Sequence, residues 1–441
     1  MQVVIAAGGK GTRLKQVTAD LPKPMVEVAG KPLLEHQVML VRKHGVRDIL
    51  ILTGYGAEHI EQYFGSGAQW DVRIEYQRET QPLGSAGALL NAFPKLQETF
   101  FVLYGDTMLN VDLKRMLAAH PAQAGATLFL HPNDHPQDSD LVELGEANEI
   151  TALHPYPHPA GYCLPNLVNA ALYVFSKHVL QPFLEHNFEQ SKPDICKHLF
   201  PAILARSGIL HGYRSREYIK DAGTPERLDK VRRHYENGRV EAGSLETPAA
   251  AVFLDRDGTV NYDSGWLNSA ARLELLPGAA EAIQAINEAG RMAVIVTNQP
   301  VVARGECSEE ELRNIHNKLE YLLGEAHAYV DAIYYCPHHP DRGFPGERTE
   351  LKISCMCRKP ATGMLEAAAR DLNIDISRSW MIGDSEADMK AAANFGIRSI
   401  LVSHNQSGFR DSNDWQGSAL QRADTLRDAV RRILNEKQIT G

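Results

Sequence analysis

Residues 250–259 read Ala-Ala-Val-Phe-Leu-Asp-Arg-Asp-Gly-Thr, and this stretch decides the fold of the second half of the chain. The apolar run predicts a buried strand, and Asp255 and Asp257 follow where that strand ends. Two carboxylates two residues apart can turn toward one point, and Gly258 lets the chain leave the strand sharply. The arrangement suits a Mg2+ site with a nucleophilic carboxylate beside a proton-donating one. A surface turn is the plainer alternative.

Three segments further along the chain supply groups that suit such a site. Val294–Val296 predicts a strand and leads into Thr297-Asn298, where a hydroxyl can hold a phosphate. Arg358-Lys359 offers positive charge. Trp380–Ile382 predicts another strand, and Asp384 follows it after one glycine. Repeated strand and helix units predict a parallel sheet with the site at the carboxyl ends of its strands.

In this order, the carboxylate pair, the threonine, the lysine and the Gly-Asp pair resemble the four motifs of the haloacid dehalogenase (HAD) superfamily of phosphatases. The resemblance implies that Asp255 attacks the phosphate and forms an aspartyl-phosphate. It implies that Asp257 protonates the leaving oxygen and then activates water. Mg2+ is expected on Asp384, on Asp255 and on the backbone carbonyl of Asp257. Thr297 and Lys359 are expected to hold the phosphoryl oxygens.

A cluster of cysteine and histidine precedes the basic pair. It reads Cys336-Pro337-His338-His339 and then Cys355-Met356-Cys357. Three thiols and one imidazole at this spacing favour a closed Zn2+ site, and free cysteines near surface histidines are the alternative. By resemblance His338 is the expected ligand, with His339 the alternative. The zinc would be structural and would place Arg358-Lys359 over the phosphatase site.

With this cluster, residues 250–435 look like the D-glycero-D-manno-heptose-1,7-bisphosphate 7-phosphatases. The related histidinol-phosphate phosphatases share much of the pattern. The resemblance extends to Ala303-Arg304-Gly305, and it assigns Arg304 and Asn298 to substrate binding. Arg358 is expected at the second phosphate of the substrate. Asp388, four residues beyond Asp384, is expected to be a carboxylate on a helix surface.

The first half of the chain begins with its own strand and phosphate-binding pattern. Val3–Ala7 predicts a buried strand, and Gly8-Gly9-Lys10-Gly11-Thr12-Arg13-Leu14 follows it. A glycine loop after a strand lets backbone N–H groups approach phosphates, and Arg13 adds charge. The dinucleotide fingerprint would need a glycine at Leu14, the P-loop spacing does not fit either, and a plain tight turn is the alternative. Pro22-Lys23-Pro24 fixes the backbone around one lysine, which suits a pre-positioned cation.

The elements after this loop alternate. A helix is expected over 33–43, a strand over 48–53, and a loop and helix over 54–64. The alternation predicts a parallel, doubly wound sheet. Near the end of this half, residues 226–239 predict a charged helix, and residues 241–248 predict a short polar linker.

The sequences Gly-Gly-Lys-Gly-Thr-Arg-Leu, Pro-Lys-Pro-Met and Gly-Lys-Pro-Leu-Leu-Glu-His look like those of the sugar-1-phosphate nucleotidyltransferases. Further matches are Pro82–Ala88, Phe101–Asp106, Asn169–Val174 and Asp221–Glu226. The resemblance covers most of residues 1–235. It implies a Rossmann-like sheet with an inserted sugar-binding portion.

The resemblance also implies the roles of individual residues. Asp106 and Asp221 are expected to bind Mg2+, with Lys23 and Arg13 catalytic. The expected nucleotide and sugar contacts are Gly8, Gly9, Gly11, Thr12, Gly84, Ser85 and Asn169. These residues make chemical sense, because nucleotidyl transfer needs a metal ion and cations to neutralise phosphate oxygens.

Composition sets the general class. A chain of 441 residues favours two domains, and 44% apolar with 23% charged residues is ordinary for soluble globular proteins. A net charge of −9 with no basic run argues against nucleic acid as a partner. The sequence has no apolar run of membrane-spanning length and no signal peptide, so we expect a cytoplasmic protein that does not bind membranes. Six cysteines do not make a disulfide framework.

The sequence therefore predicts two α/β domains, each a mainly parallel Rossmann-like sheet flanked by helices. We expect a nucleotidyltransferase domain at 1–240, a linker at 241–249 and a HAD-like phosphatase domain with a zinc loop at 250–441. The expected cofactors are Mg2+ in both domains and Zn2+ in the second, and the expected partners are sugar phosphates and nucleoside triphosphates. The oligomeric state is left open, with a homo-oligomer among the alternatives.

The joint function predicted is heptose activation for surface polysaccharide such as lipopolysaccharide. The second domain would remove the 7-phosphate of a heptose 1,7-bisphosphate, and the first would join the heptose 1-phosphate to a nucleotide from GTP. Another sugar 1-phosphate with UTP, dTTP or CTP, beside a phosphatase such as that for histidinol phosphate, is one alternative. A catalytically silent half is another, although both carboxylate pairs are present.

Overall fold

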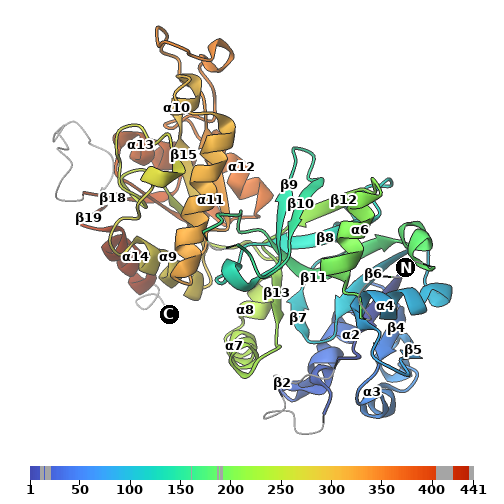
Figure 1. Cartoon of the computed structure of the whole chain (residues 1–441). Coiled ribbons are helices and arrows are strands. Elements are labelled where there is room, and N and C mark those ends of the chain that lie inside the picture. Colours follow the sequence, from blue (N-terminus) through green and yellow to red (C-terminus); the bar gives the residue numbers. More distant parts are fainter. Residues whose placement is uncertain are drawn as a thin grey trace. The chain divides into compact units, whose positions relative to one another are not determined.

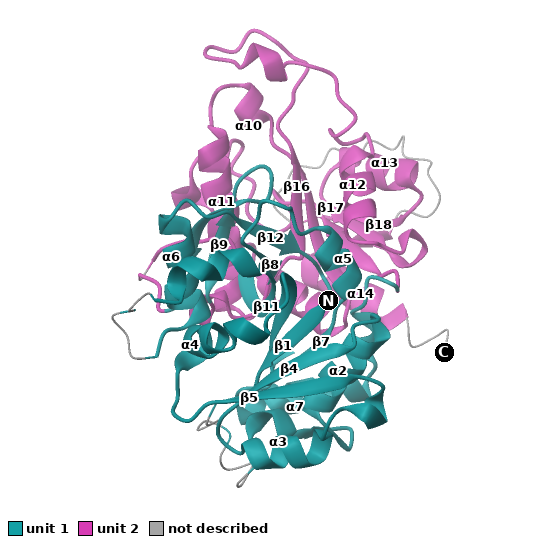
Figure 2. Ribbon diagram, turned by 90° about the vertical axis from the view of Figure 1, so that its right-hand side faces the viewer, with its two compact units in different colours: residues 1–131, 140–156, 168–246 teal, residues 132–139, 157–167, 247–441 magenta. Residues whose placement is uncertain are grey.

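The structure is a computed structural model (Figure 1), and it describes residues 1–9, 14, 21–159, 161–185, 188, 192–403 and 421–436. The chain divides into two compact units (Figure 2). Unit 1 holds residues 1–131, 140–156 and 168–246. Unit 2 holds residues 132–139, 157–167 and 247–441.

Unit 1 is built on a nine-stranded sheet whose first half is parallel. The central strand β1 (Gln2–Ala6) lies between β4 (Asp48–Thr53) and β6 (Thr99–Tyr104), and β5 (Arg73–Arg78) lies outside β4. Both sheet neighbours of β1 run parallel to it, so the loops after these strands reach the same edge. Ala7, Gly8 and Gly9, the described start of the glycine loop, follow β1 at this edge.

The second half of this sheet is largely antiparallel. Strand β11 (Val168–Ser176) pairs antiparallel with β6 and with β8 (Ala126–His131), and β8 pairs parallel with β12 (Leu210–Arg214). Strands β9 (Leu141–Leu144) and β10 (Ile150–His154) form a hairpin at the edge. Two small separate sheets pair β7 (Thr107–Asn110) with β13 (Tyr218–Asp221), and β2 (Glu27–Val28) with β3 (Lys31–Pro32).

The α-helices described in unit 1 lie between its strands and after the last of them (Figure 1). They are α2 (Leu33–Lys43), α3 (Ala57–Phe64), α4 (Gly84–Asn91), α5 (Leu113–Ala118), α6 (Phe200–Ala205), α7 (Pro225–Glu236) and α8 (Arg239–Ala242). The apolar faces of α2 and α3 pack with β1 and β4 into one core, to which Leu34, Ile60 and Ile5 belong.

Unit 2 contains a fully parallel six-stranded sheet, in the order β16-β15-β14-β17-β18-β19. The strands are β14 (Ala251–Leu254), β15 (Met292–Asn298), β16 (Ala332–Cys336), β17 (Trp380–Gly383), β18 (Arg398–Val402) and β19 (Gln421–Ala423). Because all strands point the same way, their carboxyl ends meet at one edge.

Both faces of the unit 2 sheet are covered, which explains why its strands are apolar throughout. Alternate residues of β14 enter two cores: Val252 and Leu254 join one, and Ala251 and Phe253 join the other. The first core includes α9 (Ala279–Glu288), α11 (Glu309–Glu325) and α14 (Leu426–Asn435). The second includes α12 (Gly363–Asp371) and α13 (Glu386–Phe395). A short helix, α10 (Pro300–Ala303), follows β15.

The predicted fold class is confirmed: both units are α/β, and the sheet of unit 1 also contains antiparallel strands. Helix α2 and strand β4 have the predicted bounds. The charged helix near residue 230 ends at Glu236, and the segment predicted as a linker begins inside α8. In the parts of the chain that the structure describes, no helix is long and apolar enough to cross a membrane.

Candidate active sites and metal centre

The carboxylates of unit 2 follow neighbouring strands at the carboxyl edge of the sheet. Asp255 follows β14 directly, and Asp384 follows β17. The backbone N–H of Asp255 donates to the carbonyl of Ile382 (3.0 Å), so the two strand ends are held side by side. Oxygen atoms of Asp255, Asp384 and Asp388 all lie within 4.8 Å of one another. Such a group of carboxylates can hold a hard divalent cation.

A buried lysine neutralises this group. The Lys359 side chain is 3% exposed, and its Nζ lies 2.7 Å from Oδ1 of Asp255 and 2.5 Å from Oδ1 of Asp388. It also donates to the carbonyl of Val296 (2.8 Å). Burial alone would lower the pKa of Lys359, but the charges of Asp255 and Asp388 outweigh burial and raise the pKa above its ordinary value. Lys359 is therefore a fixed cation.

The sequence-based expectation for Asp388 was wrong. Its side chain is fully buried, whereas we expected a helix-surface carboxylate. It is the third residue of α13, and there its Oδ2 accepts from the backbone N–H (3.1 Å) and the hydroxyl of Ser385. This capping box turns the carboxylate back toward the strand end instead of outward.

The environments of the two carboxylates Asp255 and Asp257 differ. Burial, with the nearby charge of Asp388, raises the pKa of Asp255 to about 7 although Lys359 opposes the shift. Burial would also raise the pKa of Asp257, but the charge of the fully buried Arg256 and the hydrogen bonds from Arg256, Asn261 and Gln299 lower it overall. Asp257 is thus held ionised beside Asp255.

The hydrogen bonds around Asp257 fix its orientation. Arg256 donates to both of its oxygens (2.8 and 3.0 Å), and the side-chain amides of Gln299 (2.8 Å) and Asn261 (2.9 Å) donate one each. The Gln299 amide also donates to Oγ1 of Thr297 (3.0 Å), which is buried at the end of β15. Gln299 and Asn261 were not recognised as site residues from the sequence.

Gly258 leaves space for Asp384. A Cβ added to Gly258 would lie 2.0 Å from Oδ2 of Asp384, and Gly258 has φ +77°. Glycine is therefore required both by the backbone and by the neighbouring carboxylate. Burial, followed by the charges of Asp255 and Asp388, raises the pKa of Asp384 to about 8.

Asn298 positions the lysine. Its side-chain amide donates to the carbonyl of Lys359 (3.1 Å), and its Oδ1 accepts from the backbone N–H of Lys359 (3.0 Å). Asn298 thus joins the end of β15 to the loop that carries the cation. The structure brings Asp255, Asp257, Thr297, Asn298, Lys359 and Asp384 together, as the sequence predicted.

A second group of cations lies in the loops of unit 2. Arg304 is 8% exposed, and its guanidinium carbon lies 3.8 Å from the ring centre of Trp266 and 4.6 Å from that of Phe344. Its Nε and one terminal nitrogen are buried without a hydrogen-bond partner among the described residues. Lys352 is 3% exposed, and its Nζ lies 4.4 Å from the Phe344 ring.

Arg358 belongs to the same group. One of its terminal nitrogens donates to the carbonyl of His338 (3.3 Å). The pKa of the neighbouring His339 shows that these three cations lie close together. Burial lowers this pKa below its ordinary value, and the charges of Arg358, Arg304 and Lys352 lower it further. Lys352 was missed in the sequence because it stands in a loop without a recognisable motif.

The predicted cysteine and histidine cluster forms. The sulfur atom of Cys336 lies 3.5 Å from that of Cys355 and 3.2 Å from that of Cys357, and the latter two sulfurs are 3.3 Å apart. Nδ1 of His338 lies 3.2 Å from the Cys357 sulfur. His339 is turned away, because its Nδ1 accepts from the backbone N–H of Asp341 (3.1 Å). Of the two histidines, His338 joins the cluster.

The two aspartates predicted to bind Mg2+ in unit 1, Asp106 and Asp221, both lie close to Gly223. A Cβ added to Gly223 would lie 2.9 Å from Oδ2 of Asp221, 3.6 Å from Nζ of Lys23 and 3.9 Å from Oδ2 of Asp106. Lys23 donates to Oδ2 of Asp106 (3.3 Å). The three predicted residues therefore surround one point. Arg227, which the sequence did not single out, donates from Nη1 to both oxygens of Asp221 (3.1 and 2.9 Å).

The predicted nucleotide loop packs on a second loop of unit 1. Gly84 has φ +75°, and a Cβ there would lie 2.5 Å from the carbonyl oxygen of Pro193. The hydroxyl of Ser85 donates to Asp194 (2.8 Å) and accepts from the backbone N–H of Ile195 (2.9 Å). Gly84 and Ser85 thus fix the start of α4 against residues 193–195.

Asn169 and the glycine loop have neighbours that the sequence did not predict. The Asn169 amide donates to the sulfur of Cys196 (3.2 Å). Gly8 lies beside Glu79, because a Cβ added to Gly8 would lie 3.1 Å from Oε1 of Glu79. The other carboxylate oxygen of Glu79, Oε2, accepts from the backbone N–H of Leu83 (3.0 Å). Among the residues that the structure describes, none has an atom within 4 Å of such a Cβ on Gly9. The predicted residues Gly11, Thr12 and Arg13 lie outside the described residues.

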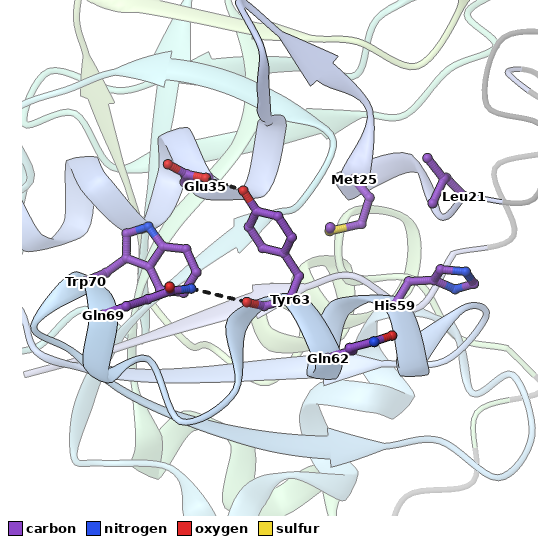
Figure 3. Close-up of a pocket in the computed structure, with 8 residues that line it drawn as sticks. All are labelled: Leu21, Met25, Glu35, His59, Gln62, Tyr63, Gln69 and Trp70. Atoms are coloured by element: carbon purple, nitrogen blue, oxygen red, sulfur yellow. Dashed lines mark hydrogen bonds between the residues drawn. The ribbon is translucent and has the colours of Figure 1, made fainter.

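Unit 1 also contains a cavity of about 730 Å³ (Figure 3). It is lined by Leu21, Met25, Glu35, His59, Gln62, Tyr63, Gln69 and Trp70. The hydroxyl of Tyr63 donates to Glu35 (2.7 Å), and Gln69 donates to the carbonyl of Tyr63 (3.2 Å). None of the lining residues is a predicted site residue, although Leu21 and Met25 stand two positions before and after Lys23 in the sequence.

Comparison with known proteins gives the class of each half. The model of the nucleotidyl transferase family matches residues 2–238, and that of the HAD-hydrolase-like family matches residues 356–429. The D-glycero-beta-D-manno-heptose-1,7-bisphosphate 7-phosphatase of Yersinia pestis is 42% identical over 154 residues, which are 34% of this chain and 79% of that protein. The protein is therefore an enzyme with a nucleotidyltransferase domain and a HAD-like phosphatase domain.

The chain belongs to the nucleotidyl transferase family, and its carboxyl-terminal half belongs to the family of the heptose bisphosphate phosphatases. Two solved structures are also similar. HddC from Yersinia pseudotuberculosis is 25% identical, covering 53% of this chain and 99% of that one, with a TM-score of 0.46. The D,D-heptose 1.7-bisphosphate phosphatase of B. bronchiseptica is 32% identical, covering 42% of this chain and 99% of that one, with a TM-score of 0.35.

Proposed function

We propose that this enzyme carries out two reactions of heptose activation. The carboxyl-terminal half removes the 7-phosphate of D-glycero-D-manno-heptose 1,7-bisphosphate. The amino-terminal half then transfers a nucleotidyl group from GTP to the remaining heptose 1-phosphate and releases pyrophosphate. The proposed domains are residues 1–240 and 250–441, with a linker at 241–249, and the proposed location is the cytoplasm.

The observation that carries the proposal is the relation to the Yersinia pestis phosphatase together with the site that the same half of the chain forms. The two proteins are 42% identical over 154 residues. Within that half, Lys359 bridges Asp255 and Asp388 at the carboxyl edge of a parallel sheet. The fusion adds support, because the product of the proposed phosphatase is the substrate of the proposed transferase.

In the phosphatase, each side chain has a distinct task. Asp255 attacks the phosphorus and forms an aspartyl-phosphate, and the sugar hydroxyl leaves. Lys359 and the hydroxyl of Thr297 hold the phosphoryl oxygens. Asp257, held ionised by Arg256, is suited to activating the water that hydrolyses this intermediate. Its earlier role as acid requires a proton, and the negative charge of the bound phosphate favours its uptake.

The carboxylates fit Mg2+. Asp255, Asp384 and the backbone carbonyl of Asp257 offer oxygen ligands, and the close approach of three carboxylates needs a positive charge beyond that of Lys359. Mg2+ would neutralise the phosphate oxygens and the attacking carboxylate there. Gly258 leaves the space in which Asp384 stands, and Asp388 holds Lys359 beside the same group.

The second cation group is suited to the other phosphate of a bisphosphate. The donors of Arg304 that have no described partner lie in a buried setting, where a charge-assisted hydrogen bond to phosphate is strong. Trp266 and Phe344 hold the guanidinium from two sides. Arg358 adds charge, and Lys352 lies in the same group, where its Nζ is also 3.5 Å from Oε2 of Glu347. Neither cation contacts the catalytic carboxylates. We assign these cations to recognition of the 1-phosphate.

The cysteine cluster fits Zn2+. The sulfur separations of 3.2–3.5 Å are a few tenths of an ångström shorter than the roughly 3.8 Å that tetrahedral Zn–S bonds of about 2.3 Å require, so a bound ion needs only a small outward shift of the thiols. His338 supplies the fourth ligand. The ligand set is complete, so the zinc would be structural. Cys357 immediately precedes Arg358 and Lys359 in the sequence, and a fixed cluster therefore fixes both cations.

In the transferase, Asp106 and Asp221 are the proposed Mg2+ ligands. Mg2+ there would neutralise phosphate oxygens of the nucleotide. Lys23 is placed beside Asp106 to act on the same phosphates. The glycine loop with Gly8, Gly9, Gly11, Thr12 and Arg13 is proposed to hold the triphosphate, Gly84 and Ser85 the nucleotide, and Asn169 the sugar.

Glu79 supports guanine as the base. Its carboxylate lies beside Gly8, at the edge of the sheet where the nucleotide is proposed to bind. A carboxylate can accept two hydrogen bonds from adjacent donors, and guanine offers such a pair at N1–H and the exocyclic amine. On the corresponding edge of adenine, cytosine and uracil, each donor stands next to an acceptor atom, and the carboxylate would repel that acceptor.

Separate substitution of the two sites tests the assignment. Asp255→Asn should abolish release of inorganic phosphate from the heptose bisphosphate and leave nucleotidyl transfer to heptose 1-phosphate intact. Asp221→Asn should do the reverse. If Asp255→Asn left phosphate release unchanged, the phosphatase site would be assigned to the wrong residues.

A further inference from the structure

The Asp221 carboxylate is already engaged by a cation of the chain itself. Nη1 of Arg227 lies 3.1 Å from Oδ1 and 2.9 Å from Oδ2 of Asp221. The backbone N–H of Gly223 donates to the same Oδ2 (3.3 Å). Both oxygens that could ligate a metal ion therefore face a guanidinium.

The partner carboxylate is occupied in the same way. Lys23 donates to Asp106 (3.3 Å), and the backbone holds the two aspartates together, because the N–H of Ala222 donates to the carbonyl of Asp106 (2.8 Å). Strands β7 and β13 pair with Asp221 opposite Thr107. Two carboxylates and two cations of the chain thus pair with each other around Gly223.

Arg227 stands where helix electrostatics disfavour a cation. Thr224 caps α7, since its hydroxyl accepts from the N–H of Arg227 (3.3 Å), and Arg227 is the third helical residue. The first turn of a helix carries a partial positive charge, so an arginine there is unfavourable unless an anion offsets it. Asp221 is that anion. A local rule broken beside a catalytic site suggests a functional reason.

We propose that Arg227 competes with a divalent cation for Asp221 and must leave this carboxylate before the cation can bind there, so that Arg227 sets the metal affinity of the nucleotidyl-transfer site. The inference rests on the proposed role of Asp106 and Asp221 as metal ligands. Arg227 is a positioning residue, because it acts through Asp221. The guanidinium that is released can then turn to the phosphates that arrive with the metal.

The size of the effect follows from exposure. The side chains of Arg227 and Asp221 are 27% and 41% exposed, so water screens the pair and exchange with a metal ion is easy. Removing Arg227 should therefore tighten metal binding modestly, by about threefold to fivefold. If Arg227 had a purely structural role, its removal would not tighten metal binding, because the loss of packing would only make the Asp221 side chain less well positioned.

The test is a titration of the full chain, loaded with zinc, with Mn2+ alone, following free Mn2+ by electron paramagnetic resonance. All variants carry Asp384→Asn so that the phosphatase site does not compete. Arg227→Gln should lower the Kd for Mn2+ by about threefold to fivefold, and Arg227→Lys, which keeps a charge, should lie near the parent. Arg232→Gln is the matched control, because Arg232 lies on the same helix and contacts Asp229 and the carbonyl of Glu27 instead. It should change nothing.

The outcomes separate the inference from the function on which it rests. If Asp221→Asn weakens Mn2+ binding and Arg227→Gln tightens it, both stand. If Asp221→Asn weakens binding but Arg227→Gln leaves it equal or weaker, the role of Arg227 is overturned and the ligand assignment stays. If Asp221→Asn leaves binding unchanged, Asp221 is not a metal ligand, and the assignment and the inference fall together.

Discussion

The ammonium nitrogen of Lys359 lies 2.7 Å from Oδ1 of Asp255, although 104 residues separate the two in the sequence. The same nitrogen lies 2.5 Å from Asp388, so one cation holds a nucleophile and a helix carboxylate at once. Because all three groups are buried, each depends on the others for its charge.

Lys359→Met should destabilise the phosphatase half by about 3–5 kcal/mol, because it leaves close carboxylates without a counter-charge. Release of phosphate should fall at least about a hundredfold, since an electrostatic contact to the phosphate is lost. Urea unfolding and a phosphate-release assay measure the two effects. Adding Mg2+ should restore part of the stability of the variant, and equal stability of variant and parent would contradict the role of the lysine.

Gly258→Ala should abolish phosphatase activity, because the added Cβ would meet Asp384 at 2.0 Å. Gly265→Ala is the matched control: Gly265 also has positive φ (+82°), but no atom of the described parts of the chain lies within 4 Å of an added Cβ. An alanine at positive φ destabilises each variant by about 1 kcal/mol, so this backbone effect is common to both. A difference in phosphatase activity between the two variants therefore reports the contact with Asp384. Comparable activity in the two variants would show that Gly258 serves the turn alone.

Arg304→Gln and Lys352→Gln should each raise KM for the heptose bisphosphate by roughly tenfold to a hundredfold, the range for a charge-assisted hydrogen bond. KM for a heptose 7-phosphate without the 1-phosphate should barely change. The exposed Arg342, in the same loop region, provides the control Arg342→Gln. A similar rise for both substrates would place these cations at the reacting phosphate instead.

Substituting a cysteine of the cluster should remove the zinc, whereas substituting a cysteine elsewhere should not. The parent chain should hold one zinc per molecule by atomic emission, and Cys357→Ser should hold none and should lose phosphatase activity, because the neighbouring Arg358 and Lys359 lose their anchor. Cys307→Ser, at a buried cysteine away from the cluster, should keep its zinc. Full activity without zinc would contradict the structural role.

Glu217 makes stability depend on pH in unit 1. Burial raises its pKa, although the N–H of Asp112 and the hydroxyl of Ser215 donate to it. A carboxyl group with a raised pKa in the folded state contributes stability below its ordinary pKa and loses it as pH rises through the folded value. Glu217→Gln should therefore become more stable relative to the parent as pH rises from the ordinary glutamate pKa of 4.5 toward neutral pH. Urea unfolding across that range measures the difference, and the exposed Glu246→Gln should show no such trend.

Much of the fold could be predicted because local patterns decide it. The periodicity of residues 33–43 and the apolar run of 48–53 gave the bounds of α2 and β4. The motif residues of unit 2 could be placed together because parallel strands bring their carboxyl ends to one edge. The meeting of Asp106 with Asp221 could be expected only from the family resemblance, since no spacing implies it.

The missed residues act through contacts that no local pattern encodes. Lys352 and Glu79 stand outside regular motifs, and the roles proposed for them depend on residues far away in the sequence. Arg227 stands in a first helical turn, and its partner Asp221 is six residues earlier, on the other side of a turn that no motif marks. Asp388 is different, because the sequence does carry a signal: Ser385 followed three residues later by an acidic residue is a capping box. That pattern would have predicted a carboxylate turned back toward the strand end.

The most direct test of the proposed function is a product assay by mass spectrometry. The whole protein, loaded with zinc, is incubated with Mg2+, D-glycero-D-manno-heptose 1,7-bisphosphate and an equal mixture of the four nucleoside triphosphates. The proposal predicts GDP-heptose as the nucleotide sugar, with phosphate and pyrophosphate released. Phosphate release without any nucleotide sugar would contradict the proposed coupling, and a nucleotide sugar carrying another base would contradict the role given to Glu79.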